Sequence, residues 1–245
     1  SWIVPFLDIR PIAMPETLYR VTALCGLAQH KQAISEALVA TQQLSVGVSS
    51  ATEGIAAAVR LYLEQVQDES AETDAGDELI RVCISLDSSN AFNTIDRSTM
   101  LEALADVAPG LLPLARLVYC RAGRLVLPNH AWKPGEDAYK VFLSRCGARQ
   151  GDPLGPILFA LGMMTAMKKV QAAHPAVAFP SFVDDVDACL TTAARDAGAA
   201  VDGVVATLRR EMGAIGVTFN DPKTHVYTRS GVDIESGVTQ VKEGI

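Results

Sequence analysis

The chain has 245 residues, of which 49% are hydrophobic and 20% charged, and its formal net charge is -7. This composition predicts a globular protein that buries a substantial core. The longest apolar run, 157–164, is too short to cross a bilayer, and no basic-then-apolar stretch opens the chain, so membrane and secretory classes are disfavoured. The cysteines number five and lack zinc or redox spacing, which favours reduced thiols in an intracellular compartment.

The negative charge is concentrated in one segment. Seven acidic residues and no basic residue lie within 64–78, so the rest of the chain sums to zero. Within 116–149, seven basic residues stand against two acidic ones, a local net charge of +5. Proteins that bind nucleic acids usually present basic surface. The second segment could therefore face a phosphate backbone, although a solvated basic surface explains it equally well.

The first third of the chain reads as helical. Apolar residues recur at helical spacing within 15–40, and 50–66 predicts another helix. The acidic stretch 67–78 is expected to be an exposed loop. Residues 79–87 are apolar and rich in β-branched side chains, which is typical of a strand buried on both faces. A carboxylate at the end of such a strand is costly unless it is paired or metal-bound, so Asp87 indicates a site.

The remaining elements alternate between helices and short strands. Helices are predicted at 97–107, 110–120, from Pro153 to about 170, and 194–213, and strands at 124–128, 139–145, within 176–192, 216–220 and 223–228. Asp152 is expected to cap the third of these helices, with Pro153 in its first turn. The strands within 176–192 are expected to meet at a tight turn near Asp184 and Asp185. The order predicts an α+β fold, an antiparallel sheet backed by helices.

Two carboxylate groups stand out, Asp87 at a strand end and Asp184 with Asp185 at a hairpin tip. If their strands are neighbours, the carboxylates converge. Magnesium prefers oxygen ligands, and two such ions about 3.5–4 Å apart can stabilise both the attacking and the leaving oxygen in phosphoryl transfer. The alternative is a polar hairpin turn, because turns favour aspartate.

Four ordered motifs and one upstream string resemble the reverse transcriptase family, particularly the non-LTR retrotransposon type. They are "LDSSNAFNTIDR" (86–97), "RQGDPLGPILFAL" (149–161), "FVDD" (182–185) and "GVTFNDPKT" (216–224), preceded by "RPIAMPETLYRV" (10–21). The resemblance implies the palm of a right-hand polymerase with partial fingers. It divides the chain into a fingers-like helical region with the acidic loop, 1–78, and a palm with the catalytic motifs, 79–245, while the thumb is expected to be absent.

The resemblance also implies roles for single residues. Asp87, Asp184 and Asp185 match the metal ligands, and Lys223 matches a lysine proposed as general acid to the pyrophosphate leaving group. A surface lysine is the equal alternative for Lys223. Phe92 matches the aromatic gate that crowds out a 2′-hydroxyl and so favours deoxynucleotides; the alternative is a core phenylalanine.

Four further positions match residues that hold the nucleotide. Gln150 and Gly151 match those that contact the incoming nucleotide, and glycine lets backbone approach closely. Arg10 matches a fingers residue that grips triphosphate, and Arg149 could assist at the phosphates. Near these motifs, Asp96 is expected at a helix start and Asp187 on a strand surface.

The expected function is RNA-directed DNA polymerisation, with two Mg²⁺ ions, or Mn²⁺ in their place, transferring deoxynucleotides to a primer 3′ end. The expected partners are an RNA template, a DNA primer, deoxynucleoside triphosphates, and a thumb or other domains of a longer chain or protein partners, without a membrane. The expected location is intracellular, and nuclear for a eukaryotic retroelement. One alternative is a catalytically reduced domain serving as a structural or interaction module. Another is a metal-dependent cyclase on a related palm, which leaves "RQGDPLGP" and Phe92 without a role.

Overall fold

A computed structural model describes residues 12–65, 78–128, 139–228, 234, 236–237 and 241–243. Arg10 and all but the last residue of the acidic loop lie outside these residues, so what the sequence indicates for them stays a prediction. Within the described residues, no helix is both long and apolar enough to span a membrane.

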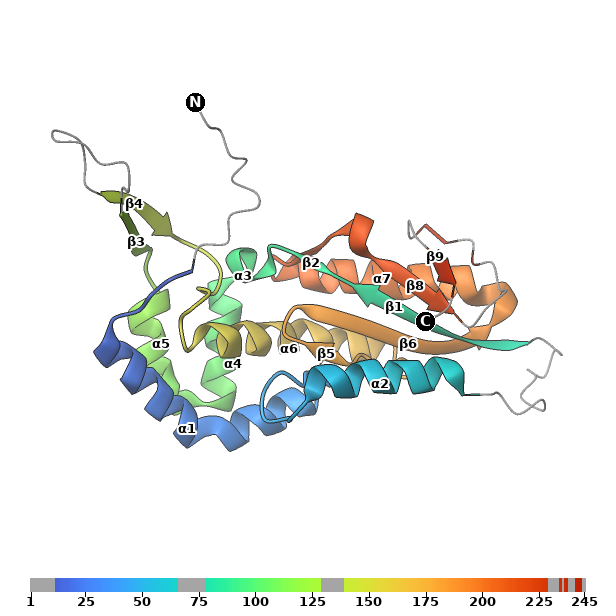
Figure 1. Ribbon diagram of the computed structural model, residues 1–245, viewed down its shortest axis with the longest axis horizontal. Coiled ribbons are helices and arrows are strands. Elements are labelled where there is room, and N and C mark those ends of the chain that lie inside the picture. Colours follow the sequence, from blue (N-terminus) through green and yellow to red (C-terminus); the bar gives the residue numbers. More distant parts are fainter. Residues whose placement is uncertain are drawn as a thin grey trace, which may run out of the picture.

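A sheet lies at the centre of the fold (Figure 1). Among the described residues it has five strands, in the order β5 (Ser181–Phe182), β6 (Asp185–Ala193), β1 (Leu79–Leu86), β8 (His225–Thr228) and β9 (Val241–Glu243). All neighbours are antiparallel except β8 and β9, which pair in parallel. The predicted α+β fold with an antiparallel sheet is confirmed, and β9 adds a parallel edge that the pattern did not reveal.

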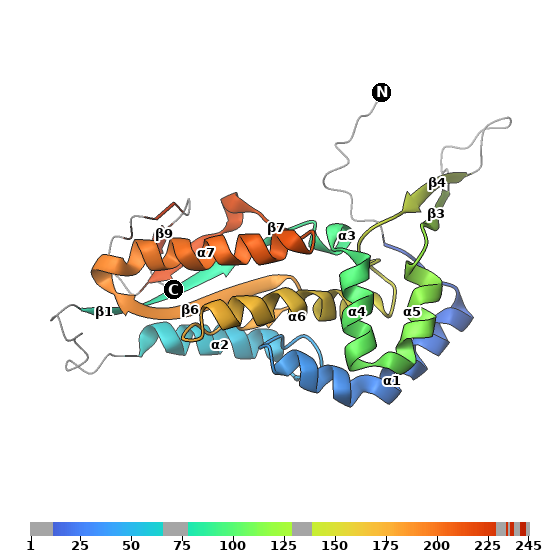
Figure 2. The same ribbon diagram turned by 180° about the vertical axis from the view of Figure 1, so that it is seen from behind.

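Helices α6 (Gly155–Ala173) and α7 (Ala197–Ala214) cover one face of this sheet (Figure 2). Successive side chains of a strand point to opposite faces, so Val82, Ile84 and Leu86 of β1 face these helices and lie in the main core. Cys83 points the other way and packs under α2 (Ala51–Glu64). The strand is therefore buried on both faces along much of its length, as its apolar sequence predicts.

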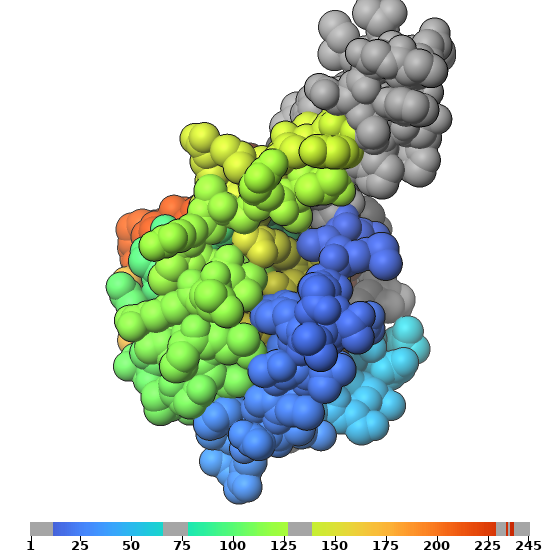
Figure 3. Space-filling view, turned by 90° about the vertical axis from the view of Figure 1, so that its left-hand side faces the viewer, coloured from blue at the N-terminus to red at the C-terminus, as the bar shows by residue number. Residues whose placement is uncertain are grey.

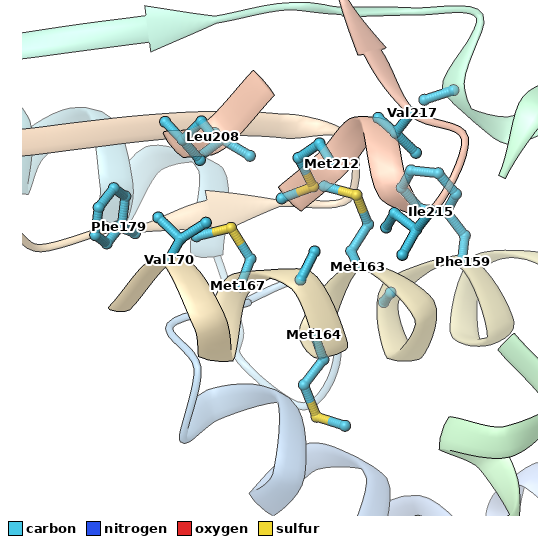
Figure 4. Packing of buried hydrophobic residues seen from close by; sticks show 14 of the residues in the cluster. Phe159, Met163, Met164, Met167, Val170, Phe179, Leu208, Met212, Ile215 and Val217 are labelled. Carbon is cyan, nitrogen blue, oxygen red and sulfur yellow. The ribbon is translucent and has the colours of Figure 1, made fainter. Parts of the chain in front are cut away.

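Part of the main core lies between α6 and α7 (Figure 4). Met163 of α6 points toward Met212 of α7, while Met164 points to the other side of α6. Phe159 and Phe179 lie at opposite ends of the group, and both are fully buried. Because α6 is apolar on most of its surface up to Met167, it can pack against several elements at once, α7 among them.

The other end of the molecule gathers segments from distant parts of the sequence (Figures 1 and 3). Helices α1 (Thr17–Val39), α4 (Arg97–Val107) and α5 (Leu112–Tyr119) pack there, and a hairpin of β3 (Gly123–Pro128) and β4 (Tyr139–Ser144) stands out from them. Figure 3 shows the segment that leads into α6 between α1 and α5. A division at residue 78 stays a prediction, but α5 and the hairpin share this end with α1.

The predicted start of α6 was wrong. The helix begins at Gly155, two residues later than predicted, its N-cap residue is Leu154, and the proline in its first turn is Pro156. Asp152 does not cap the helix because it lies two residues before the N-cap, where its carboxylate accepts from the Leu154 N–H and from groups described below. The pattern also missed the two-residue strand β2 (Ser88–Ser89), which pairs with β7 (Thr218–Phe219), and the short helix α3 (Ala91–Thr94).

Candidate active site

The sheet brings the two carboxylate groups to the same edge. Leu86 at the end of β1 pairs with Val186 of β6, so Asp87 follows at the level of Asp185. Asp184 lies in the turn between β5 and β6, and the hydroxyl of Ser88 donates to its carbonyl oxygen at 3.0 Å. The predicted convergence of these strand ends is confirmed by the register.

The turn that carries Asp184 contains an unusual backbone. Val183, the residue before it, has φ 56°. A β-branched residue rarely adopts this left-handed conformation, which costs roughly 1–3 kcal/mol. Such a conformation persists only where the surroundings hold it, so other parts of the chain must stabilise this turn.

Electrostatics at this edge are those of an anionic site with one nearby cation. Partial burial, and then the negative charges of Asp184 and Asp87, raise the pKa of Asp185. The Lys223 ammonium lies 3.3 Å from Asp87 Oδ2, in an ion pair open to solvent. The backbone N–H of Asn220 donates to the Asp87 carbonyl at 2.8 Å, which holds the segment leading to Lys223 beside the site.

The donor chemistry fits a divalent cation. Asp87, Asp184 and Asp185 offer carboxylate oxygens, the ligands that Mg²⁺ prefers, and their mutual repulsion is what a cation would relieve. In the part of the chain that the structure describes, however, no three or more His, Cys, Asp or Glu side chains are grouped so that they could hold a metal. The aspartates are therefore close in the fold but not arranged as a finished metal site.

Phe92 lies in α3 beside this edge, half-buried. Its ring stacks on Phe159 with centroids 4.3 Å apart and planes 9° from parallel. Phe159 is fully buried in α6, so it gives the Phe92 ring a fixed support from the core. The two interpretations of Phe92 are thus compatible, because one face of the ring belongs to the core and its exposed part can meet a ligand.

Gln150 and Gly151 form a tight turn in which the Asp152 N–H donates to the Arg149 carbonyl at 3.2 Å. Gly151 has φ 89°, and a Cβ at this position would lie 2.4 Å from the Ala13 carbonyl oxygen. The Ala13 N–H also donates to the Gln150 carbonyl at 2.7 Å. The close approach that requires glycine is thus made by the N-terminal segment; contact of this turn with a nucleotide stays a prediction.

One hydroxyl holds both ends of this turn. The hydroxyl of Tyr119, in α5, accepts from the Arg149 N–H at 3.2 Å and donates to Asp152 Oδ2 at 3.0 Å. Asp152 is 4% exposed, and its Oδ1 accepts from the Tyr19 hydroxyl at 2.7 Å and from the Leu154 N–H at 2.9 Å. Burial first, and then the nearby carboxylate, raise the pKa of both tyrosines. The network joins α1 and α5 to the start of α6.

Arg149 is engaged inside this network. Its guanidinium lies 5.2 Å from the centre of the Tyr119 ring and donates to the Val118 carbonyl at 3.0 Å. On the other side of the network, Arg97 is 8% exposed, also lies 5.2 Å from that ring, and donates to carbonyls of the loop 144–147. A role for Arg149 at phosphates stays a prediction, and this packing gives it a structural role as well.

Asp96 and Asp187 lie as the sequence indicates. Asp96 is the N-cap of α4, and its carboxylate accepts from the Thr99 N–H at 2.9 Å. Asp187 lies on β6 on the same sheet face as Asp185, half-buried; burial raises its pKa, and a hydrogen bond with Ser85 opposes this shift.

Sequence reasoning did not single out Tyr19, Tyr119 or Asp152 for this network, nor Gln43, whose contacts are described below. Their partners in other elements lie 30 to 140 residues away in the sequence. For Asp152 the local sequence, a carboxylate between Gly151 and Pro153, indicates a residue that bonds to nearby backbone. This signal does not distinguish the tyrosine network from an ordinary helix cap.

Comparison with known proteins agrees with this geometry. Residues 7–242 match the family described as "Reverse transcriptase (RNA-dependent DNA polymerase)". The Retrotransposable element SLACS 132 kDa protein of Trypanosoma brucei gambiense is 31% identical over 170 residues, which cover 64% of this chain and 13% of that protein.

Solved structures share the fold at low sequence identity. Apo telomerase of Candida tropicalis has a TM-score of 0.55 at 13% identity, covering 81% of this chain and 36% of that one. A form of this telomerase truncated from the C-terminal domain has a TM-score of 0.52 at 14% identity, covering 87% and 42%. The chain thus spans a minor part of its relatives, and the match over nearly its full length shows that it belongs to the reverse transcriptase family.

Proposed function

We propose that this chain is the core of an RNA-directed DNA polymerase, which transfers deoxynucleotides to a primer 3′ end. The observation that carries the proposal is the strand register that sets Asp87 level with Asp185, beside Asp184 in the hairpin turn. The three carboxylates repel one another, as the raised pKa of Asp185 indicates, and a bound cation would relieve this repulsion more fully than the solvent-open ion pair of Asp87 with Lys223. A domain retained only as a scaffold would have no such requirement.

Asp87, Asp184 and Asp185 would hold two Mg²⁺ ions, or Mn²⁺ in their place. When bound, these ions supply charge that stabilises the attacking and leaving oxygens of phosphoryl transfer. The carboxylates must be ionised to bind them, and the raised pKa of Asp185 means that this site loses affinity at a higher pH than an isolated aspartate would.

The other side chains would bind and orient the substrate. The exposed part of Phe92 would meet the sugar where a ribonucleotide carries its 2′-hydroxyl, and Gln150 and Gly151 would face the nucleotide. Lys223, whose ammonium lies beside Asp87, would donate a proton to pyrophosphate. Arg10 and Arg149 would assist at the phosphates.

The proposed partners are an RNA template, a DNA primer and deoxynucleoside triphosphates. Exposed basic residues at the α5 and hairpin end support a polyanion there, namely Arg116, Arg121, Arg124, Lys140 and Arg145. We also propose that a thumb is supplied by further domains of a longer chain or by protein partners, and that the protein acts inside the cell, in the nucleus for a eukaryotic retroelement.

Primer extension on an RNA template with Mg²⁺ tests the proposal. The chain should extend the primer, and Asp184→Asn should reduce extension at least about 100-fold, since removal of a single group that stabilises transition-state charge costs about that much. A folded chain that neither extends a primer nor binds a divalent cation would overturn the polymerase proposal and leave the scaffold. Equal extension by both proteins would identify a contaminant.

A further inference from the structure

The turn that carries the aspartates is held by a side chain from a distant part of the chain. Gln43 follows α1 and is 2% exposed. Its Nε2 donates to the Val183 carbonyl at 3.0 Å, and its Oε1 accepts from the Val183 N–H at 2.9 Å. One amide thus engages both backbone groups of a single residue, which is the pairing that a neighbouring strand would make.

The backbone around Gln43 is fixed as well. Residues 42–44 run parallel to β5, where the Leu44 N–H donates to the Ser181 carbonyl and the Ser181 N–H donates to the Gln42 carbonyl, both at 2.9 Å. β5 itself has two residues. The Gln43 side chain therefore continues the pairing beyond the end of β5, into the turn that carries Val183.

Val183 is where such support is needed. It has φ 56°, a conformation that opposes its β-branched side chain, and it directly precedes Asp184 and Asp185. Rotation of Val183 toward an ordinary φ would turn the peptide that leads to Asp184 and change the direction of both carboxylates. The two hydrogen bonds from Gln43 oppose this rotation, because a change of φ with the Val183 N–H held at Oε1 would carry the Val183 carbonyl away from Nε2.

We infer that Gln43 is a positioning residue for Asp184 and Asp185, acting through the backbone of Val183. The inference rests on the proposed polymerase function for its kinetic consequence. Its structural consequence, a change in the affinity of the carboxylates for a divalent cation, does not depend on the proposed function. Without the Gln43 side chain, the carboxylates of Asp184 and Asp185 should point toward a shared cation less often.

Gln42 is a matched control. It is the same residue type on the same segment, it also has a positive φ (58°), and its Oε1 also accepts from a backbone N–H, that of Phe179 at 2.7 Å. This contact holds the chain before β5 and does not touch the turn. Gln42→Met and Gln43→Met therefore make the same change of side chain, but the first removes a hydrogen bond to the chain before β5 and the second removes the two hydrogen bonds to Val183.

The kinetic test is primer extension on an RNA template at saturating Mg²⁺. Gln43→Met should reduce kcat about 10-fold or more and leave the KM for deoxynucleotide within about twofold, whereas Gln42→Met should leave both within about twofold. Adding Val183→Gly to Gln43→Met should restore part of kcat, since glycine adopts a positive φ without steric cost. Equal losses in the two Met variants, or no recovery with glycine, would overturn the inference.

Mn²⁺ binding, measured by calorimetry on the same proteins, separates this inference from the proposed function. Gln43→Met should weaken Mn²⁺ binding about 10-fold relative to the wild type and Gln42→Met. If the wild type extends no primer but this difference in Mn²⁺ binding is found, the polymerase proposal fails and the positioning role stands. If all three proteins bind Mn²⁺ equally, or none binds it, the positioning role fails whatever the extension assay shows.

Discussion

The stack of Phe92 on Phe159 predicts that a residue without substrate contact controls the choice of sugar. Phe159→Leu leaves Phe92 in place but removes the ring on which it lies, 4.3 Å away. Phe92 should then sample other orientations, and the space where a 2′-hydroxyl would clash should open part of the time. We expect Phe159→Leu to admit ribonucleotides more readily while retaining deoxynucleotide incorporation.

The size of the effect follows from the stack. A stacked aromatic pair is worth about 0.5–1.5 kcal/mol beyond the area that it buries. Since 1.4 kcal/mol corresponds to a factor of ten, the ratio of kcat/KM for deoxynucleotide over ribonucleotide should fall about 2- to 12-fold. Phe92→Ala removes the ring itself and should lower the ratio further. Primer extension with matched pairs of nucleotides measures both ratios.

Phe179→Leu is the control for general damage to the core. Phe179 is fully buried in the same core as Phe159, at its opposite end, and undergoes the same chemical change (Figure 4). Its nucleotide ratio should equal that of the wild type. An unchanged ratio in Phe159→Leu beside a collapsed ratio in Phe92→Ala would show that the stack does not hold the gate. An unchanged ratio in Phe92→Ala would refute the gate itself.

Three further predictions concern stability and the turn at Gln150. Asp187→Asn should raise the urea midpoint of unfolding at pH 7. Because burial raises the pKa of the Asp187 carboxyl, the wild type loses stability as the pH rises above about 3.9 and through the folded-state pKa. The difference in midpoint between the variant and the wild type should therefore vanish near pH 3. Gly147 has φ 72°, and a Cβ there would lie 2.4 Å from backbone atoms, so Gly147→Ala should lower the free energy of unfolding by about 2 kcal/mol or more. Gly203 lies on open helix surface, so Gly203→Ala should raise the free energy of unfolding by up to about 1 kcal/mol. Equal effects of the two variants in urea titrations would contradict this reasoning. Tyr119→Phe should raise the KM for deoxynucleotide several-fold, because it releases the Arg149 end of the turn. Tyr19→Phe should not, because it removes one hydrogen bond to Asp152 Oδ1 and leaves the Tyr119 hydroxyl bonded to both Arg149 and Asp152. Steady-state extension distinguishes the two variants, and matching KM values would count against the role of the Tyr119 hydroxyl.

Regular elements could be predicted from the sequence because their signals are local. The apolar run 79–86 predicts a buried strand, and the two aspartates after Val183 predict a hairpin turn between strands. Placing both at one edge required the motif resemblance, since periodicity does not say which strands are neighbours. The register of β1 with β6 then followed from burying one face of each strand under α6 and α7.

The contacts that hold the candidate site could not be predicted in this way. Asp152 precedes a proline near a helix start, so local rules assign it to a helix cap. The tyrosine hydroxyls that donate to its carboxylate lie 33 and 133 residues away in the sequence. Gln43 lies in a polar connection whose sequence resembles any exposed turn, and its partner is 140 residues distant. Such pairings depend on how whole helices pack, which a short stretch of sequence does not record.

The position of α2 constrains the path of a nucleic acid over the sheet. Asp87 and Asp185 share their sheet face with Cys83 and Cys189, and α2 covers that face from those cysteines onward. Under the proposed function, a growing duplex moves away from the site after each nucleotide is added. The direction along the strands is closed by the helix, whose Tyr62 hydroxyl is hydrogen-bonded to Thr191 at 2.9 Å. We therefore expect translocation to run across the strands and not along them.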